Sequence, residues 1–172
     1  MFLTLLGTVV LGLTAAGVLY ALFHTFKIKA GRWLIPMSAG LAMLGFHLWN
    51  EYSWYPRTAG DLPEHVVVAG TYTGRNAMQF WTYIVPRVDR FSAVNMQSLR
   101  RHPEHDDLVM TEVYLVGRYT PTAAVTQLYD CDQPRRLDIA PDSALTESGL
   151  PADPAWLSIP SDDPIRQKVC TA

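Results

Sequence analysis

The most polar stretch of the chain, residues 100–107, holds two histidines close to three carboxylates. Imidazole and carboxylate groups together are suitable ligands for zinc or copper, so His102 and His105 are the candidate metal ligands. Against this, Pro103 separates the two histidines, and charged loops of this composition are usually only solvated. The sequence therefore predicts no firm metal site.

The chain has two cysteines, Cys131 and Cys170, which lack the Cys-x-x-Cys spacing of a redox-active pair. Two cysteines in a domain outside the cytoplasm usually pair, because that compartment is oxidising. We expect a disulfide that closes a loop of about forty residues, which stabilises the fold by roughly 3 to 4 kcal/mol in the chain-entropy description.

Recognised catalytic motifs are absent from the sequence. It contains no Gly-rich phosphate-binding loop, nucleophile elbow, His-Glu-x-x-His helix or haem-attachment motif. We therefore expect neither an enzyme nor a bound cofactor. The residues best suited to line a small-ligand pocket are three aromatics, Trp81, Tyr83 and Tyr114.

The element that must position these residues is an N-terminal membrane hairpin, expected over residues 1–50. No charged residue occurs from Phe2 to Phe23 or from Trp33 to Trp49. As a helix, the first run spans roughly 33 Å, which matches the hydrocarbon core of a bilayer. The second run is shorter but is extended by an interfacial collar of Trp and Tyr residues. We therefore predict two membrane-spanning helices.

Three basic residues in the turn between the runs set the expected orientation: Lys27, Lys29 and Arg32. Basic residues that flank membrane spans stay in the cytoplasm, so the N-terminus and the C-terminal domain are expected outside it. In a Gram-negative bacterium this is the inner membrane, with the domain in the periplasm. A cleaved signal peptide is the alternative for the first run. We disfavour it because no basic segment precedes Phe2 and the run is long.

Small residues recur at helical spacing in both runs. They are Thr8, Gly12 and Ala16 in the first run, and Ser38, Ala42 and Gly45 in the second. Small residues let helices approach closely in lipid, so we expect these two faces to meet, with an outside subunit as the alternative partner. His24 and His47 fall at opposite ends of the hairpin, which favours interfacial wetting over a shared haem.

The rest of the chain should form one small, mainly β domain, an antiparallel sheet or half-barrel over residues 64–140. Runs of β-branched and aromatic residues predict strands at 65–72, 79–85, 87–95, 108–119, 123–129 and 135–139. An aromatic collar and tether over residues 51–63 should join the domain to the membrane. Over residues 141–172 the prolines predict an extended tail that wraps the domain and is clamped by the disulfide.

The charge of the domain excludes two classes of partner. All 16 acidic residues lie at Glu51 or later, and three of the 14 basic residues lie in the hairpin turn, which leaves 11 basic against 16 acidic residues. Nucleic acid requires a basic face, so we exclude it as a partner. The same balance argues against docking on anionic lipid headgroups.

Two hypotheses for the function remain. The first is a non-catalytic accessory or assembly subunit of a larger bacterial inner-membrane complex, which binds other integral membrane subunits through its hairpin and its periplasmic domain. The second is a membrane-anchored periplasmic sensing or small-ligand-binding module with a pocket at the three aromatic residues. Both hypotheses place the chain in the lipid bilayer.

Overall fold

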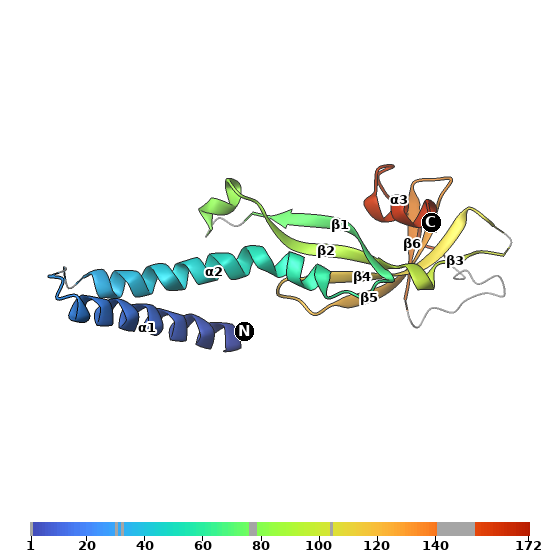
Figure 1. Ribbon diagram of the computed structural model, residues 1–172. Helices are drawn as coiled ribbons and strands as arrows, with labels where there is room; N and C mark the ends of the chain where they lie inside the picture. The colour runs from blue at the N-terminus through green and yellow to red at the C-terminus, as the bar shows by residue number, and fades with distance from the viewer. Residues whose placement is uncertain (1, 30, 32, 76–78, 104, 141–153) are drawn as a thin grey trace. The chain divides into compact units, whose positions relative to one another are not determined.

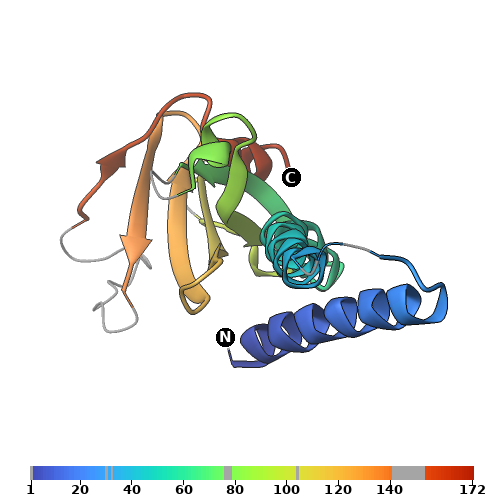
Figure 2. The same cartoon turned by 90° about the vertical axis from the view of Figure 1, so that its left-hand side faces the viewer.

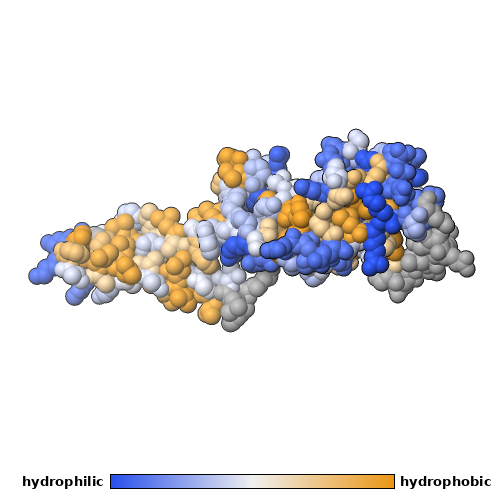
Figure 3. Space-filling view, turned by 45° about the vertical axis from the view of Figure 1, so that its right-hand side comes forward, coloured by the Kyte–Doolittle hydropathy of each residue, from blue (hydrophilic) through white to orange (hydrophobic). Residues whose placement is uncertain are grey.

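The computed structural model describes residues 2–29, 31, 33–75, 79–103, 105–140 and 154–172. The chain divides into two compact units, Met1–Trp54 and Tyr55–Ala172, and each is described by itself. The first is helical and largely hydrophobic at its surface, whereas the surface of the second is mostly hydrophilic (Figure 3).

Two helices form the first unit, α1 (Phe2–Thr25) and most of α2 (Leu34–Gly60), shown in Figure 1. They meet at a glycine, because Gly12 is buried and a Cβ added there would overlap the side chain of Met43. At Gly7 an added Cβ would lie 3.9 Å from the ring of Phe46. The absence of side chains at Gly7 and Gly12 therefore allows larger residues of α2 to approach α1.

The prediction of two membrane-spanning helices is not confirmed. Among the described residues, α1 over Thr4–Thr25 is the one helix that is long and apolar enough to cross a membrane, and a signal sequence has the same properties. The physical reason lies in the second helix. Its charge-free part includes His47 and ends at Asn50 and Glu51, so no long apolar segment fits within it.

The predicted tether over residues 51–63 is wrong for most of its length, because α2 continues to Gly60. Pro56 lies inside the helix. A proline there removes one backbone hydrogen bond but does not end a helix whose neighbouring residues are packed. Within the second unit, Tyr55 supplies such packing, since its ring lies 5.4 Å from that of Phe91. Only residues 61–65 connect the helix to the first strand.

One antiparallel sheet forms the second unit and confirms the predicted half-barrel. Register shifts in its first strand bend the sheet, which curves in the view of Figure 2. The strand order over the described residues is β1-β2-β4-β5-β6-β7, with β3 paired to β4. The strands are β1 (Val66–Gly74), β2 (Arg87–Asn95), β3 (Arg100–Arg101), β4 (Leu108–Gly117), β5 (Ala123–Asp130), β6 (Arg135–Ile139) and β7 (Leu157–Ser158).

The strand predicted at residues 79–85 is wrong, because Phe80–Tyr83 forms a 3-10 helix, η1. An aromatic run becomes a strand only where a neighbouring strand is free to pair with it. Here β1 and β2 pair directly with each other, so the run is left as their connection. Local bonds hold it instead: the backbone N–H and the hydroxyl of Thr82 both donate to the carbonyl of Gln79, at 2.9 and 2.7 Å.

Alternate residues of the strands form the main core on the inner face of the sheet. The core cluster consists of Val94, Val109, Val113, Tyr129, Ile165 and Val169. Ile165 and Val169 come from a C-terminal helix, α3 (Pro164–Cys170), which covers this part of the sheet. On the other face, Leu108, Leu128 and Leu137 form a second cluster.

The predicted extended tail over residues 141–172 is wrong at its end, where α3 forms. Residues 141–153 lie outside the described residues, and β7 is extended as expected. The helix starts at Pro164, where the fixed φ of proline suits a first turn. Asp163 caps it by accepting hydrogen bonds from the backbone N–H groups of Ile165 and Arg166, at 3.0 and 2.8 Å.

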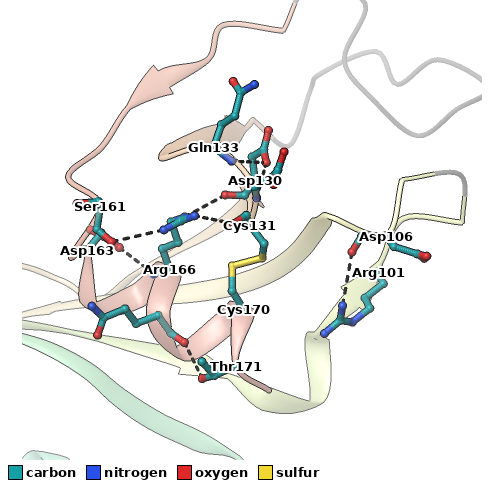
Figure 4. Close-up of a disulfide and its surroundings, with 12 residues drawn as sticks. Arg101, Asp106, Asp130, Cys131, Gln133, Ser161, Asp163, Arg166, Cys170 and Thr171 are labelled. Atoms are coloured by element: carbon teal, nitrogen blue, oxygen red, sulfur yellow. Dashed lines mark hydrogen bonds between the residues drawn. A yellow bond between two sulfur atoms is a disulfide. The ribbon is translucent and has the colours of Figure 1, made fainter.

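A disulfide and an arginine fasten α3 to the end of β5 (Figure 4). The sulfur atoms of Cys131 and Cys170 lie 1.96 Å apart, at disulfide distance, as the sequence predicted. The guanidinium of Arg166 donates to the carbonyl of Cys131 at 2.6 Å and to that of Asp130 at 3.0 Å. The helix is therefore held both by a covalent bond and by hydrogen bonds from a charged guanidinium.

Asp130 organises the turn that follows β5. Its carboxylate accepts from the backbone N–H groups of Asp132 and Gln133, both at 2.9 Å, and from the side chain of Arg135 at 2.7 Å. Burial alone would raise the pKa of this carboxyl. The hydrogen bonds from Gln133, Arg135 and Asp132 outweigh burial, so the pKa lies below its ordinary value of 3.8.

We expect Asp130→Asn to lower the free energy of unfolding at neutral pH by about 1–3 kcal/mol, because the charged acceptor is lost. A depressed pKa in the folded state stabilises the protein above the ordinary pKa, and this contribution disappears as pH falls through the folded value. The difference between variant and wild type should therefore shrink below about pH 4. Denaturant unfolding in detergent across pH measures it.

Asp132→Asn is the matched control, because this side chain is exposed and lies two residues further on. It should change stability little at any pH. A deficit of Asp130→Asn that is the same at pH 3 and pH 7 would contradict the assignment of an ionised, hydrogen-bonded carboxylate.

Candidate functional site

A groove of about 600 Å³ runs along the inner face of the half-barrel, beside the part that α3 covers. This volume is within the range of small-ligand pockets. Ile165 of α3 lines one end of it. The main lining residues of the strands are Tyr72, Arg90, Leu115, Ala123, Val125, Gln127, Arg136 and Asp138.

Strand register explains why these residues meet. Arg90 pairs with Gly117, Leu115 with Ala123, and Gln127 with Asp138. Directly opposed residues in a sheet point to the same face, and positions two apart along a strand share it. The groove therefore collects one residue in two from β2, β4, β5 and β6, which lie far apart in the sequence.

A hydrogen-bonded chain forms one wall of the groove. The hydroxyl of Tyr129 donates to Oε1 of Gln127 at 2.6 Å, and Nε2 of Gln127 donates to Oδ1 of Asp138 at 2.7 Å. Nε of Arg136 lies 3.5 Å from the same carboxylate oxygen. Burial raises the pKa of the Tyr129 phenol well above its ordinary value, so its hydroxyl stays a neutral donor. This wall is fixed in orientation before any ligand arrives.

Arg90 and an apolar surface form the other side of the groove. The guanidinium of Arg90 lies 5.4 Å from the centre of the Tyr72 ring, which orients it. Arg90 is exposed and, among the described residues, makes no ion pair. Leu115 and Val125 provide apolar surface between Arg90 and the wall of Gln127 and Asp138. The groove thus combines an exposed guanidinium with an apolar body.

The three aromatic residues predicted to line a pocket are not brought together. Tyr114 lies on the other face of β4, where its hydroxyl donates to Glu112 at 2.8 Å. Trp81 and Tyr83 belong to η1, and Tyr83 is exposed. None of the three lines the groove on the inner face.

Within the described part of the segment, the candidate metal ligands lie close together without a third ligand. The rings of His102 and His105 are 5.2 Å apart between their centres. Among the described residues, no group of three or more histidine, cysteine or acidic residues is placed to hold a metal ion. Glu104 lies outside the described residues. The described part of this segment offers two imidazoles for a site that normally needs three or four ligands.

The residues predicted for helix packing differ in how exposed they are. Thr8, Gly12 and Ala16 lie on the less exposed face of α1, as do Ser38 and Ala42 on α2. The hydroxyls of Thr8 and Ser38 donate to carbonyls of their own helices, Thr4 and Ile35, both at 2.8 Å. Gly45 is exposed, and a Cβ added there would meet nothing within 4 Å.

The sequence interpretation missed every polar residue of the groove. A signal was present in β5 and β6, where Gln127, Arg136 and Asp138 occupy the strand positions that alternate with apolar ones. Polar residues at inward positions of a strand mark either a solvated face or a site. Choosing between the two requires the curvature of the sheet.

Comparison of the chain with protein-family models, with curated proteins and with solved structures finds no match. The candidate site is therefore argued from the geometry of this chain. Its strongest elements are the groove, the fixed polar wall and the exposed guanidinium of Arg90.

We expect Gln127→Leu to lower the free energy of unfolding by about 1–3 kcal/mol, because the buried hydroxyl of Tyr129 loses its acceptor. Tyr129→Phe should also destabilise, since it leaves Oε1 of Gln127 without its donor. The double variant should cost less than the sum of the two, by on the order of 1 kcal/mol. Denaturant unfolding of the four proteins measures this coupling.

Thr126→Ala provides the control, because its side chain points to the other face of β5. Its effect should simply add to that of Tyr129→Phe. Full additivity of Gln127→Leu with Tyr129→Phe would contradict the hydrogen-bonded wall.

Proposed function

We propose that this chain is a membrane-anchored binding module whose groove takes a small ligand with an apolar body and an anionic group. The observation that carries the proposal is the groove of about 600 Å³ with Arg90 exposed at its side. A carboxylate or sulfonate placed against Arg90 would form charge-assisted hydrogen bonds. The apolar part of the ligand would cover Leu115 and Val125.

The anchor in this proposal is a helical hairpin in a bacterial inner membrane. Its support is the apolar α1, the absence of charge between Trp33 and Trp49, and the close contact of α1 with α2 at Gly12. A glycine that lets two helices approach is a common packing device in lipid. Basic residues in the connection between the helices support a cytoplasmic location for that connection.

The proposed location of the domain is the periplasmic side. Its support is the pair of cysteines at disulfide distance, because disulfides persist in oxidising compartments. The orientation derived from the basic connection agrees with this. A ligand would then reach the groove from outside the cytoplasm.

The recognition step follows from the two sides of the groove. On one side Asp138 is already held by Gln127, so a second carboxylate is not attracted there. On the other side Arg90 offers a fork of donors that matches a planar carboxylate. The ligand is thus oriented with its anionic group toward β2 and its apolar part toward β5. The described groove supplies no nucleophile with an activating base, which supports binding over catalysis.

An accessory subunit of a membrane complex is the second candidate, and one observation favours it. Gly40 and Gly45 of α2, and Gly17 of α1, have open space where a Cβ would stand. Such positions allow a further helix to approach closely. The C-terminal helix adds no support to this candidate, because α3 packs on its own sheet.

We expect 2-naphthoate to bind the full chain in nanodiscs, as observed by saturation-transfer NMR of the ligand. Arg90→Gln should weaken binding by about tenfold or more, because a charge-assisted contact is removed. The neutral analogue 2-naphthalenemethanol should bind wild type and variant alike. Arg100→Gln in β3, outside the lining of the groove, is the matched control. Equal affinity of Arg90→Gln and wild type for 2-naphthoate would overturn the groove assignment.

The location has its own test. In spheroplasts, external protease should digest the C-terminal domain, and Cys131 and Cys170 should resist thiol alkylation until a reductant is added. In inverted vesicles the domain should be protected. A domain that is digested only in inverted vesicles, with both thiols free, would refute the periplasmic proposal while leaving ligand binding to be judged by the naphthoate measurement.

A further inference from the structure

The connection between β1 and β2 presents large apolar side chains to the outside. Phe80 is 72% exposed, Ile84 81%, Tyr83 56% and Val85 54%. Thr82 is fully buried and bonds to Gln79, so the turn is held while its apolar side chains point outward. Figure 1 shows this turn, in green, beyond the ends of both strands. We call Phe80, Tyr83, Ile84 and Val85 the apolar tip.

Arginines surround the apolar tip. Gly74 pairs with Arg87, and Arg90 pairs with Gly117, so the ends of β1, β2 and β4 lie together at this end of the domain. Tyr119 lies between two of these arginines, with its ring 5.9 Å from the guanidinium of Arg87 and 5.7 Å from that of Arg118. The basic residues at this end are the exposed Arg75 and Arg90, the half-buried Arg118, and Arg87, which is buried and paired with Asp89.

Among the described residues at the end of the apolar tip, Asp89 is the one carboxylate, and it is paired with Arg87 at 2.8 Å. The opposite end, where Val66 pairs with Asn95 and Leu108 with Asp130, carries charges of both signs. Its acidic residues include Asp61, Glu64, Asp106, Asp107, Asp130 and Asp132, and its basic residues include Arg100, Arg101, Arg135 and Arg166. The negative total of the domain therefore conceals one basic end.

We propose that the apolar tip inserts into the surface of an anionic lipid bilayer, with Arg75 and Arg118 against the headgroup phosphates. The proposal rests on the membrane anchor proposed above. The aromatic and aliphatic side chains of the tip match the membrane interface, where apolar groups enter the bilayer. The Tyr and Arg side chains beside them match the headgroup level, where cations remain at the phosphates. A convex tip of four side chains suits lipid better than a protein partner, whose interface normally buries about 800 Å² on each side.

Photoactivatable lipid tests the proposal with the full chain. Nanodiscs would contain phosphatidylglycerol and a phosphatidylcholine with a diazirine in its acyl chain. Because Arg75 and Arg87 bound the segment, trypsin releases residues 76–87 as one peptide, and mass spectrometry reports its lipid adducts. We expect adducts on residues 76–87 and also on the peptide of residues 1–27. The yield on residues 76–87 should fall several-fold in discs without phosphatidylglycerol.

The double variant Phe80→Ser and Ile84→Ser should reduce the adducts on residues 76–87 by roughly tenfold, and those on residues 1–27 not at all. Leu157→Ser in β7, which also replaces an exposed apolar side chain by serine, is the control and should leave both unchanged. The wild-type comparison of the two lipid mixtures stands even if the double variant does not fold.

The outcomes separate this inference from the anchor. Labelled residues 1–27 with unlabelled residues 76–87 would overturn the inference and leave the anchor standing. Absence of lipid on residues 1–27 would refute the anchor itself. Crosslinks from residues 76–87 to a second protein or to a second copy of the chain, in place of lipid, would show that a protein covers the apolar tip and would also overturn the inference.

Discussion

The packing of α3 against the inner face of the sheet is the contact on which the rest of the domain depends. Ile165 and Val169 complete a core that Val94, Val109 and Val113 could not close among themselves. Apolar burial supplies the stabilisation, while Arg166 and the disulfide fix where the helix lies. Because α3 covers only part of the inner face, the uncovered remainder becomes the groove, and Ile165 belongs to both. The candidate site thus exists because α3 leaves part of the inner face of the sheet uncovered.

Short-range sequence patterns predicted the parts of the fold that do not depend on tertiary context. Strand alternation located β4 and β5, and the presence of two cysteines predicted their pairing. The failures share a cause, which is tertiary context. The aromatic run at η1 had strand composition but no neighbour to pair with, and α3 is too short for periodicity to reveal it after a proline-rich segment. The tether predicted over residues 51–63 is instead helical up to Gly60, with Pro56 inside the helix.

The groove could not be predicted from the sequence, for a different reason. Its residues come from strands whose register brings Gln127 opposite Asp138 and Arg90 opposite Gly117. A shift of one residue in any strand would turn those side chains to the other face, and composition does not encode register. Net charge has a similar limit as a guide to the surface. The total for the domain is negative, yet the fold brings Arg75, Arg87 and Arg118 together beside η1 with Asp89.

The link between Cys131 and Cys170 joins positions 39 residues apart and closes the intervening chain into a covalent ring. A protease that nicks this ring at one place therefore does not release the C-terminal helix. The two fragments migrate together until a reductant separates them, and α3 remains on the sheet at an effective concentration that a severed peptide could not reach. The half-barrel can thus tolerate a cut in the segment before β7 and keep its inner face covered.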